Sequence, residues 1–233
     1  MNTKKLLTTL AILASLISSS QARFFLGLEG GYVYSGVDES REDSKSCVDW
    51  VCTITKPGYH IKNAYSSNGY LINLNLGNEY HFDNQNKFGI RWIGLIGYGN
   101  ANIENKKGTL NLKNYSGYLV DLAIGADILF DILRFDKKNT FGFFVGVEAD
   151  VRVLNSKKNY LNSNGKYYFP VFNSFSLRLV PRFGLSLFLN DHYRIELIGK
   201  IPAYSKCDGS GQSEEEYRMT TSYDAMLSYK YIF

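Results

Sequence analysis

The chain has 233 residues and a formal net charge of +4; aromatic residues make up 15% of it, including 18 Tyr, alongside 21 Gly. Lys4 and Lys5 supply two of those charges, so the basic balance gives no indication of a nucleic-acid partner. Tyr and Gly at these levels suit an all-β protein, and a chain of this length is expected to form one domain.

The first 22 residues have the pattern of a secretory signal peptide. A basic pair precedes an uncharged, largely apolar run at 6–17, and Ser20 and Ala22 have the small side chains of a cleavage site. We expect cleavage after Ala22, which leaves residues 23–233 as an exported chain. The apolar run is too short to span a bilayer, and no later stretch has about eighteen consecutive apolar residues.

Eight later segments alternate apolar and polar side chains, as a strand does when its two faces meet different surroundings. The predicted strands are 24–34, 69–82, 88–99, 115–130, 141–152, 174–187, 193–201 and 221–233. Short turns alternate with four long polar loops at about 35–68, 100–114, 153–172 and 203–220. An even strand count with alternating short and long connections is typical of a transmembrane antiparallel up-and-down β-barrel, with short periplasmic turns and long extracellular loops.

One predicted strand contains a proline. Pro181 has no N–H and removes a ladder donor from a sheet that should have no edge, so we assign it to a β-bulge. Pro202 ends the predicted strand at 193–201.

Three cysteines fall in the predicted loops. In an exported protein, Cys47 and Cys52 could close a small loop as a disulfide, and we interpret the pair as a structural staple. Cys207 is then left over, or pairs instead with one of the first two. No His stands at the spacing of a zinc ligand set, so we expect no metal and no cofactor.

Charge indicates which face of the predicted barrel is the interior. The apolar face carries no charge, whereas the polar face carries eight acidic and seven basic side chains: Glu29, Glu79, Asp121, Asp127, Glu148, Asp150, Glu196 and Asp224 against Arg91, Arg152, Arg178, Arg182, Arg194, Lys200 and Lys230. Lipid penalises Arg or Lys at mid-depth by about 2–4 kcal/mol, whereas a soluble lipocalin-type barrel turns its apolar face inward around a ligand. We therefore predict that the apolar face contacts outer-membrane lipid and that ion pairs fill the lumen.

Aromatic residues mark both ends of the apolar face. The predicted periplasmic ends carry Phe24, Phe82, Phe88, Phe130, Phe141, Tyr193 and Phe233. The opposite ends carry Tyr34, Tyr70, Tyr98, Tyr118, Phe175 and Tyr223. Two aromatic girdles of this kind are typical of the two interfaces of a membrane.

The last strand ends on Tyr229-Lys230-Tyr231-Ile232-Phe233, which resembles the closing strand of bacterial outer-membrane barrels. That resemblance implies that Tyr229, Tyr231 and Phe233 form the signal read by the barrel-assembly machinery. Together with the segment His192-Tyr-Arg-Ile-Glu-Leu-Ile-Gly-Lys-Ile-Pro202, the ending resembles the Helicobacter outer membrane protein family. The family resemblance implies an outer-membrane location, with the loops extracellular and both termini periplasmic, and an adhesion or porin-like role.

The chain has only three histidines: His60 in the first loop, and His81 and His192 near predicted periplasmic turns. No Ser-His-Asp grouping is implied on one rim, so we expect no enzyme activity. We expect a monomeric barrel that serves envelope structure or surface adhesion, with Tyr- and Asn-rich loops that could bind a host surface or a glycan. A small porin-like channel is the alternative, and a lipid-modifying enzyme based on His60 is a more distant one.

Overall fold

The structure, a computed structural model, describes residues 22–41, 44–48, 51–56, 64–82, 87–107, 115–136, 138–157, 160–161, 167–168, 171–209 and 215–233. The predicted signal peptide, up to Gln21, and His60 lie outside these ranges. None of the described residues forms a helix that is long and apolar enough to cross a membrane.

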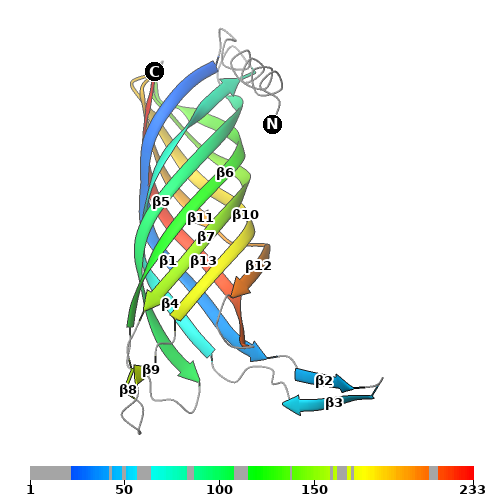
Figure 1. The fold of residues 1–233 in the computed structure, drawn as a ribbon. Helices are drawn as coiled ribbons and strands as arrows, with labels where there is room; N and C mark the ends of the chain where they lie inside the picture. Colours follow the sequence, from blue (N-terminus) through cyan, green and yellow to red (C-terminus); the bar gives the residue numbers. More distant parts are fainter. Residues whose placement is uncertain are drawn as a thin grey trace, which may run out of the picture.

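An antiparallel sheet closes into an eight-stranded barrel (Figure 1). Seven of its strands are continuous: β1 (Ala22–Arg41), β4 (Ala64–His81), β5 (Phe88–Lys107), β6 (Tyr115–Arg134), β7 (Thr140–Lys157), β10 (Val171–Leu189) and β13 (Glu215–Ile232). The remaining strand is divided into β11 (Tyr193–Lys200) and β12 (Tyr204–Gly209). Neighbours in sequence are neighbours in the wall, and β1 closes the barrel against β13. The predicted all-β, up-and-down barrel is confirmed.

The closing seam between β1 and β13 depends on a glycine that admits the neighbouring backbone. A Cβ on Gly31 would lie 2.1 Å from the carbonyl oxygen of Ala225 and 2.7 Å from the Cα of Met226. The adjacent Gly30 has no such constraint, because a Cβ at that position would have its nearest neighbouring atoms 3.8 Å away. Gly31 is therefore required for the close approach of the first and last strands.

The strands extend further than predicted. β1 continues to Arg41 and β4 begins at Ala64, so the predicted loop 35–68 contains two strand ends and a hairpin of β2 (Ser44–Val48) and β3 (Val51–Lys56). The short pair β8 (Tyr160–Leu161) and β9 (Tyr167–Tyr168) lies within the third predicted loop. Past the lipid, an outward side chain has no need to be apolar. The backbone ladder therefore continues beyond the residues whose alternation of apolar and polar side chains predicted the strand.

The predicted bulge at Pro181 is wrong, because β10 keeps one register against β7 through the pair Pro181↔Val147. The irregularity lies in the strand on the other side of β10. There the ladder with β11 ends at Lys200 and the ladder with β12 begins at Tyr204, one residue out of register. Pro202 lies in this break.

Backbone geometry explains why β10 tolerates its proline. The carbonyl oxygen of Pro181 accepts a hydrogen bond from the N–H of Ile201 (3.2 Å). In an antiparallel ladder the N–H and C=O of one residue face the same neighbour. The donor that Pro181 lacks therefore faces the break between β11 and β12, where the ladder is already interrupted.

Two short turns at the same end of the barrel as the C-terminus have well-defined chemistry. Asn190 and Asp191 both have positive φ (53° and 64°), as a type I′ turn requires, and this turn matches the right-handed twist of the flanking strands. In the turn after β6, the carboxylate of Asp136 accepts hydrogen bonds from the backbone N–H of Lys138 (2.7 Å) and the side-chain amide of Asn139 (2.5 Å). These hydrogen bonds lower the pKa of Asp136.

The two faces of the wall have opposite exposure. Leu28 is 57% exposed on the outside of β1, whereas the next residue, Glu29, is fully buried on the inside. Aromatic rings gather at both ends of the apolar outer face. At the end that carries the chain termini, the ring centres of Phe24 and Phe233 are 5.6 Å apart. At the loop end, the ring of Tyr34 stacks on that of Tyr223. An apolar exterior around a charged interior is the reverse of a soluble barrel and matches a wall that contacts lipid.

Candidate functional site

The charged lumen is the chemically distinctive part of the molecule. All fifteen charged residues predicted for the lumen lie inside the barrel, and none is more than 4% exposed. Alternation along each strand directs them inward. Because an unpaired buried charge is costly, their pairing decides what the lumen can do. The charges form three layers, which we call the terminal, central and loop-side layers.

The terminal layer lies nearest the chain termini. Arg194 pairs with Glu79 (3.3 Å) and with Asp131 (3.1 Å). His81 lies 3.4 Å from Asp131, and Arg23 reaches Glu79 at 2.9 Å from the rim. Two carboxylates are therefore held by two guanidinium groups and an imidazole.

Sequence reasoning missed three members of this layer. Asp131 follows the predicted strand end at Phe130, although it continues the inward parity of Asp127. Arg23 directly precedes the predicted strand 24–34, and His81 lies within the predicted strand 69–82, where it shares the inward parity of Glu79 and is buried. One more residue of alternation would have found Asp131 and Arg23, and parity within the predicted strand 69–82 would have found His81.

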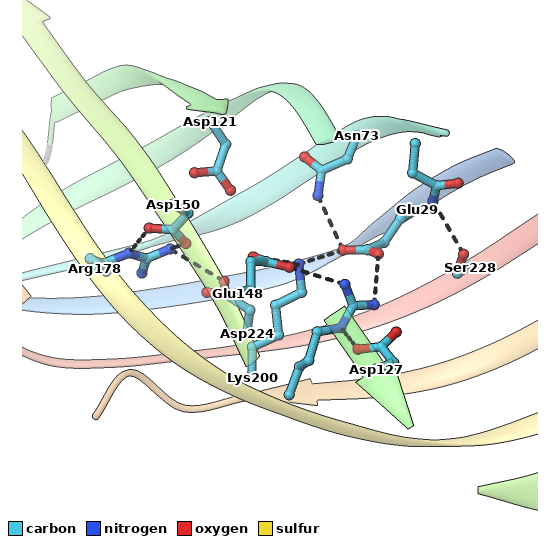
Figure 2. Close-up of polar contacts among 12 residues, drawn as sticks. Glu29, Asn73, Asp121, Asp127, Glu148, Asp150, Arg178, Lys200, Asp224 and Ser228 are labelled. Atoms are coloured by element: carbon cyan, nitrogen blue, oxygen red, sulfur yellow. Dashed lines mark hydrogen bonds and ion pairs between the residues drawn. The ribbon is translucent and has the colours of Figure 1, made fainter. Parts of the chain in front are cut away.

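The central layer is balanced, with four carboxylates and four cations: Glu29, Asp127, Glu148 and Glu196 with Arg91, Arg182, Lys200 and Lys230. Lys200 lies between two carboxylates, with its Nζ 2.7 Å from Glu29 and 3.1 Å from Glu148, as Figure 2 shows. Arg182 pairs with Glu148 (3.1 Å) and with Asp127 (3.2 Å). Each carboxylate in this half of the layer therefore meets at least two cations.

Arg91 connects the other half of the central layer. Its guanidinium contacts Asp127 through two nitrogens, at 2.6 and 3.0 Å, and also pairs with Glu196. Glu196 forms a second ion pair, with Lys230. Arg91 and Glu196 are 105 residues apart in the chain, so only the closed barrel brings them together.

The loop-side layer has more acid than base. Arg152 pairs with Asp121 (3.0 Å) and with Asp224 (2.7 Å). Arg178 pairs with Asp150 and lies 3.9 Å from Asp224; Asp150 and Asp224 appear on either side of it in Figure 2. Among the described residues, three carboxylates thus share two guanidinium groups.

The lumen is not purely ionic, which corrects the predicted ion-pair core. The rings of Phe25, Phe144 and Phe188 are buried inside it. The guanidinium of Arg91 lies 4.9 Å from the centre of the Phe144 ring, and that of Arg194 lies 5.0 Å from Phe188. Rings stabilise the buried cations through cation–π contact and fill the space between the charged layers.

A cluster of apolar side chains adjoins the loop-side layer. Leu119 and Leu154 form the cross-strand pair next to Asp121↔Arg152 on the loop side. Together with Val33, Leu71 and Ala101 they belong to one buried cluster. We call these five residues the apolar collar. Among the described residues, buried side chains therefore continue from the charged layers into the collar.

The remaining predicted sites are placed less completely. Cys47 and Cys52 face each other in the β2–β3 ladder, but their side chains lie outside the described part, as does that of Cys207, so the disulfide stays a prediction. The N–H of Phe233 donates to the carbonyl oxygen of Phe24 (2.9 Å), which attaches the terminal aromatic to the first strand. Recognition of Tyr229, Tyr231 and Phe233 by the assembly machinery also stays a prediction. No cluster of His, Cys, Asp and Glu within the described ranges is arranged to hold a metal.

Several solved structures are similar to this chain. They include the outer membrane protein OprG from Pseudomonas aeruginosa (13% identity, TM-score 0.46, 91% of this chain and 97% of that chain covered). Also similar is the attachment invasion locus protein Ail of Yersinia pestis (13% identity, TM-score 0.31, 88% of this chain and 98% of that chain covered). The outer membrane protease OmpT from Escherichia coli is similar as well (8% identity, TM-score 0.40, 92% of this chain and 98% of that chain covered). No curated protein matches the chain.

A family comparison supplies the identification. The model of the family described as "Helicobacter outer membrane protein" matches residues 73–233, which include six of the eight barrel strands in full and half of β4. The match agrees with the exterior and the closed antiparallel wall described above. The chain is a member of the Helicobacter outer membrane protein family and forms an eight-stranded outer-membrane β-barrel.

Proposed function

We propose that this protein is a closed surface barrel that serves envelope structure or surface adhesion through its loops and does not conduct solutes. The observation that supports the proposal is the lumen itself, in which three layers of paired, buried charges adjoin the apolar collar. A solute would have to separate buried ion pairs to pass. Breaking one such pair costs about 3–5 kcal/mol, which keeps an open state below about one molecule in a hundred.

Strand length supports a role for the loop end. β1, β5 and β6 each have 20 residues, whereas about 9–11 tilted residues cross a bilayer. An excess of roughly nine residues, at about 3.3 Å per residue and a tilt near 40°, extends the wall about 20 Å beyond the lipid. The barrel thus raises a platform with the β2–β3 hairpin beside it (Figure 1). In the proposed orientation this platform faces the outside of the cell, where a host surface or glycan could bind.

Conductance and binding measurements test the proposal. Purified, refolded protein in planar bilayers should give no steady conductance. For the adhesion role, cells that display the full barrel should bind host cells or a glycan array, and replacement of residues 42–63 by a short linker should remove that binding. For the envelope role, the same replacement should leave the detergent resistance of the cells unchanged, because the barrel alone supplies it. Replacement of residues 108–114, which belong to another predicted loop, by the same linker serves as the control.

Two results would overturn it. Steady open channels in the unmodified protein would favour the porin-like alternative. A lipid-modifying activity that is lost in His60→Ala would favour an enzyme.

A further inference from the structure

The lipid-facing wall contains a groove that the proposed function does not use. It crosses β4, β5, β6 and β7 and has a volume of about 750 Å³. Its apolar lining includes Tyr80, Ile90, Trp92, Ala126, Ile128 and Val147. We call it the wall groove.

Cross-strand pairing explains why the wall is hollowed there. Ala126 lies between Trp92 on β5 and Val147 on β7, so a methyl group stands between two much larger side chains. One pair toward the terminal end, Ile128 lies between Ile90 and Val145 in the same way and forms the next row. The small residue forms the floor and the larger ones form the sides.

A polar side chain lies at one end of the groove. Asn78 has the outward parity of β4, between Phe24 on β1 and Trp92 on β5, and is only 6% exposed. An amide carries two N–H donors and a carbonyl acceptor, and it is costly in hydrocarbon without a hydrogen bond. A ligand that suits this groove has an apolar chain and an acceptor at one end.

The position of the wall groove in the membrane indicates which molecule would occupy it. The groove lies inside the apolar band, with Asn78 next to the terminal aromatic girdle at Phe24, so phospholipid acyl chains are the molecules in contact with it. An ester carbonyl lies at the head of such a chain, at the depth of the interface. We propose that the wall groove holds one acyl chain of a membrane phospholipid, with the Asn78 amide donating to its ester carbonyl.

A second groove provides the contrast. It has a volume of about 510 Å³ and is lined by Phe183, Leu185, Leu197, Gly199 and Ala225 among others. Its lining contains only apolar side chains, so nothing there would orient an ester. The proposal therefore concerns the wall groove alone.

Trp92 provides a direct probe, because the chain has two Trp and Trp50→Phe leaves Trp92 as the only indole, which can be excited selectively over Tyr. The folded Trp50→Phe protein in detergent micelles is titrated with phosphatidylcholine whose acyl chains are dibrominated, since bromine quenches indole fluorescence on contact. We expect saturable quenching that is complete at a single lipid per chain. Ala126→Phe should fill the floor and weaken that binding at least tenfold, and Asn78→Leu should weaken it severalfold.

Ala149→Phe is the matched control for Ala126→Phe, because Ala149 is a small outward residue on the neighbouring strand, β7, and is outside the groove lining. It should leave the quenching curve unchanged, and the mobility of unboiled samples on gels verifies that every variant is folded. Quenching that rises in proportion to lipid without saturation, and equally in all variants, would overturn the proposal. Quenching that is absent while sedimentation shows a dimer disrupted by Ala126→Phe would also overturn it, because a second copy would then occupy the groove.

Discussion

Replacement of Arg182 by Met tests whether charge balance stabilises the lumen. Arg182 lies 3.1 Å from Glu148 and 3.2 Å from Asp127, inside a layer of four acids and four bases. At an effective dielectric constant near 20, each contact corresponds to roughly 5 kcal/mol of Coulomb attraction before desolvation is subtracted. Removal of one partner from a buried pair has a net cost of about 3–5 kcal/mol, and here it leaves the layer with four carboxylates and three cations. We expect Arg182→Met to lower the free energy of unfolding by that amount.

A second substitution distinguishes charge balance from packing. In Arg182→Met, Lys200 must serve both Glu29 and Glu148. Addition of Glu148→Gln removes the excess negative charge and returns the layer to three acids and three bases. The double variant should therefore be more stable than Arg182→Met by about 1–3 kcal/mol, within the usual range of coupling between neighbouring sites.

Urea unfolding in lipid vesicles, followed by Trp fluorescence, measures these differences, and the mobility of unboiled samples on gels reports the folded fraction. Lys138→Met is the control for loss of a cation, because Lys138 is exposed in a turn and should change stability by no more than about 0.5 kcal/mol. If the double variant is no more stable than Arg182→Met, the layer is held by packing and the charge-balance argument fails.

Three further predictions concern closure, pH and the cysteines. Gly31→Ala should cost at least about 1–3 kcal/mol and reduce the folded fraction on gels, because its Cβ meets backbone, whereas Gly30→Ala should fold normally; equal behaviour would contradict the close approach. The pKa of Asp136 is lowered in the folded state, so its contribution to folding stability is present above the ordinary value of 3.8 and is lost as pH falls through the folded pKa. In urea titrations, the difference in stability between the unmodified protein and Asp136→Ala should therefore shrink between pH 7 and pH 3. Mass spectrometry without reduction should find a peptide linked through Cys47 and Cys52, and free thiols there would refute the staple.

Alternation carried most of the fold prediction. A strand places successive side chains on opposite faces, so parity alone assigned Glu29 to the lumen and Leu28 to lipid, as the structure has them. The same argument failed where the surroundings changed along a strand. Past Tyr34 the sequence no longer alternates apolar with polar residues, so the predicted strand ended there, while the ladder continues to Arg41.

Inward aromatics were missed for a related reason. Phe144 shares its parity with Glu148, but the prediction treated the inner face as polar. Inside the barrel its ring contacts the guanidinium groups of Arg91 and Arg182, a favourable place that hydrophobicity does not reveal. Pro181 was misjudged similarly: the break that accommodates it lies on another strand, which no local pattern around the proline could show.

The sequence by itself therefore determined the export pattern as an expectation, the number and order of the strands, and the sign of each face, because these depend on residues that are close together in the chain. Only the tertiary structure decided which acid meets which base, as for Arg91 and Glu196 across the lumen, where the wall is hollowed, and where the ladder is broken. Those outcomes depend on the register of every strand pair and on closure of β1 against β13. Closure is a property of the whole ring, and no single segment contains it.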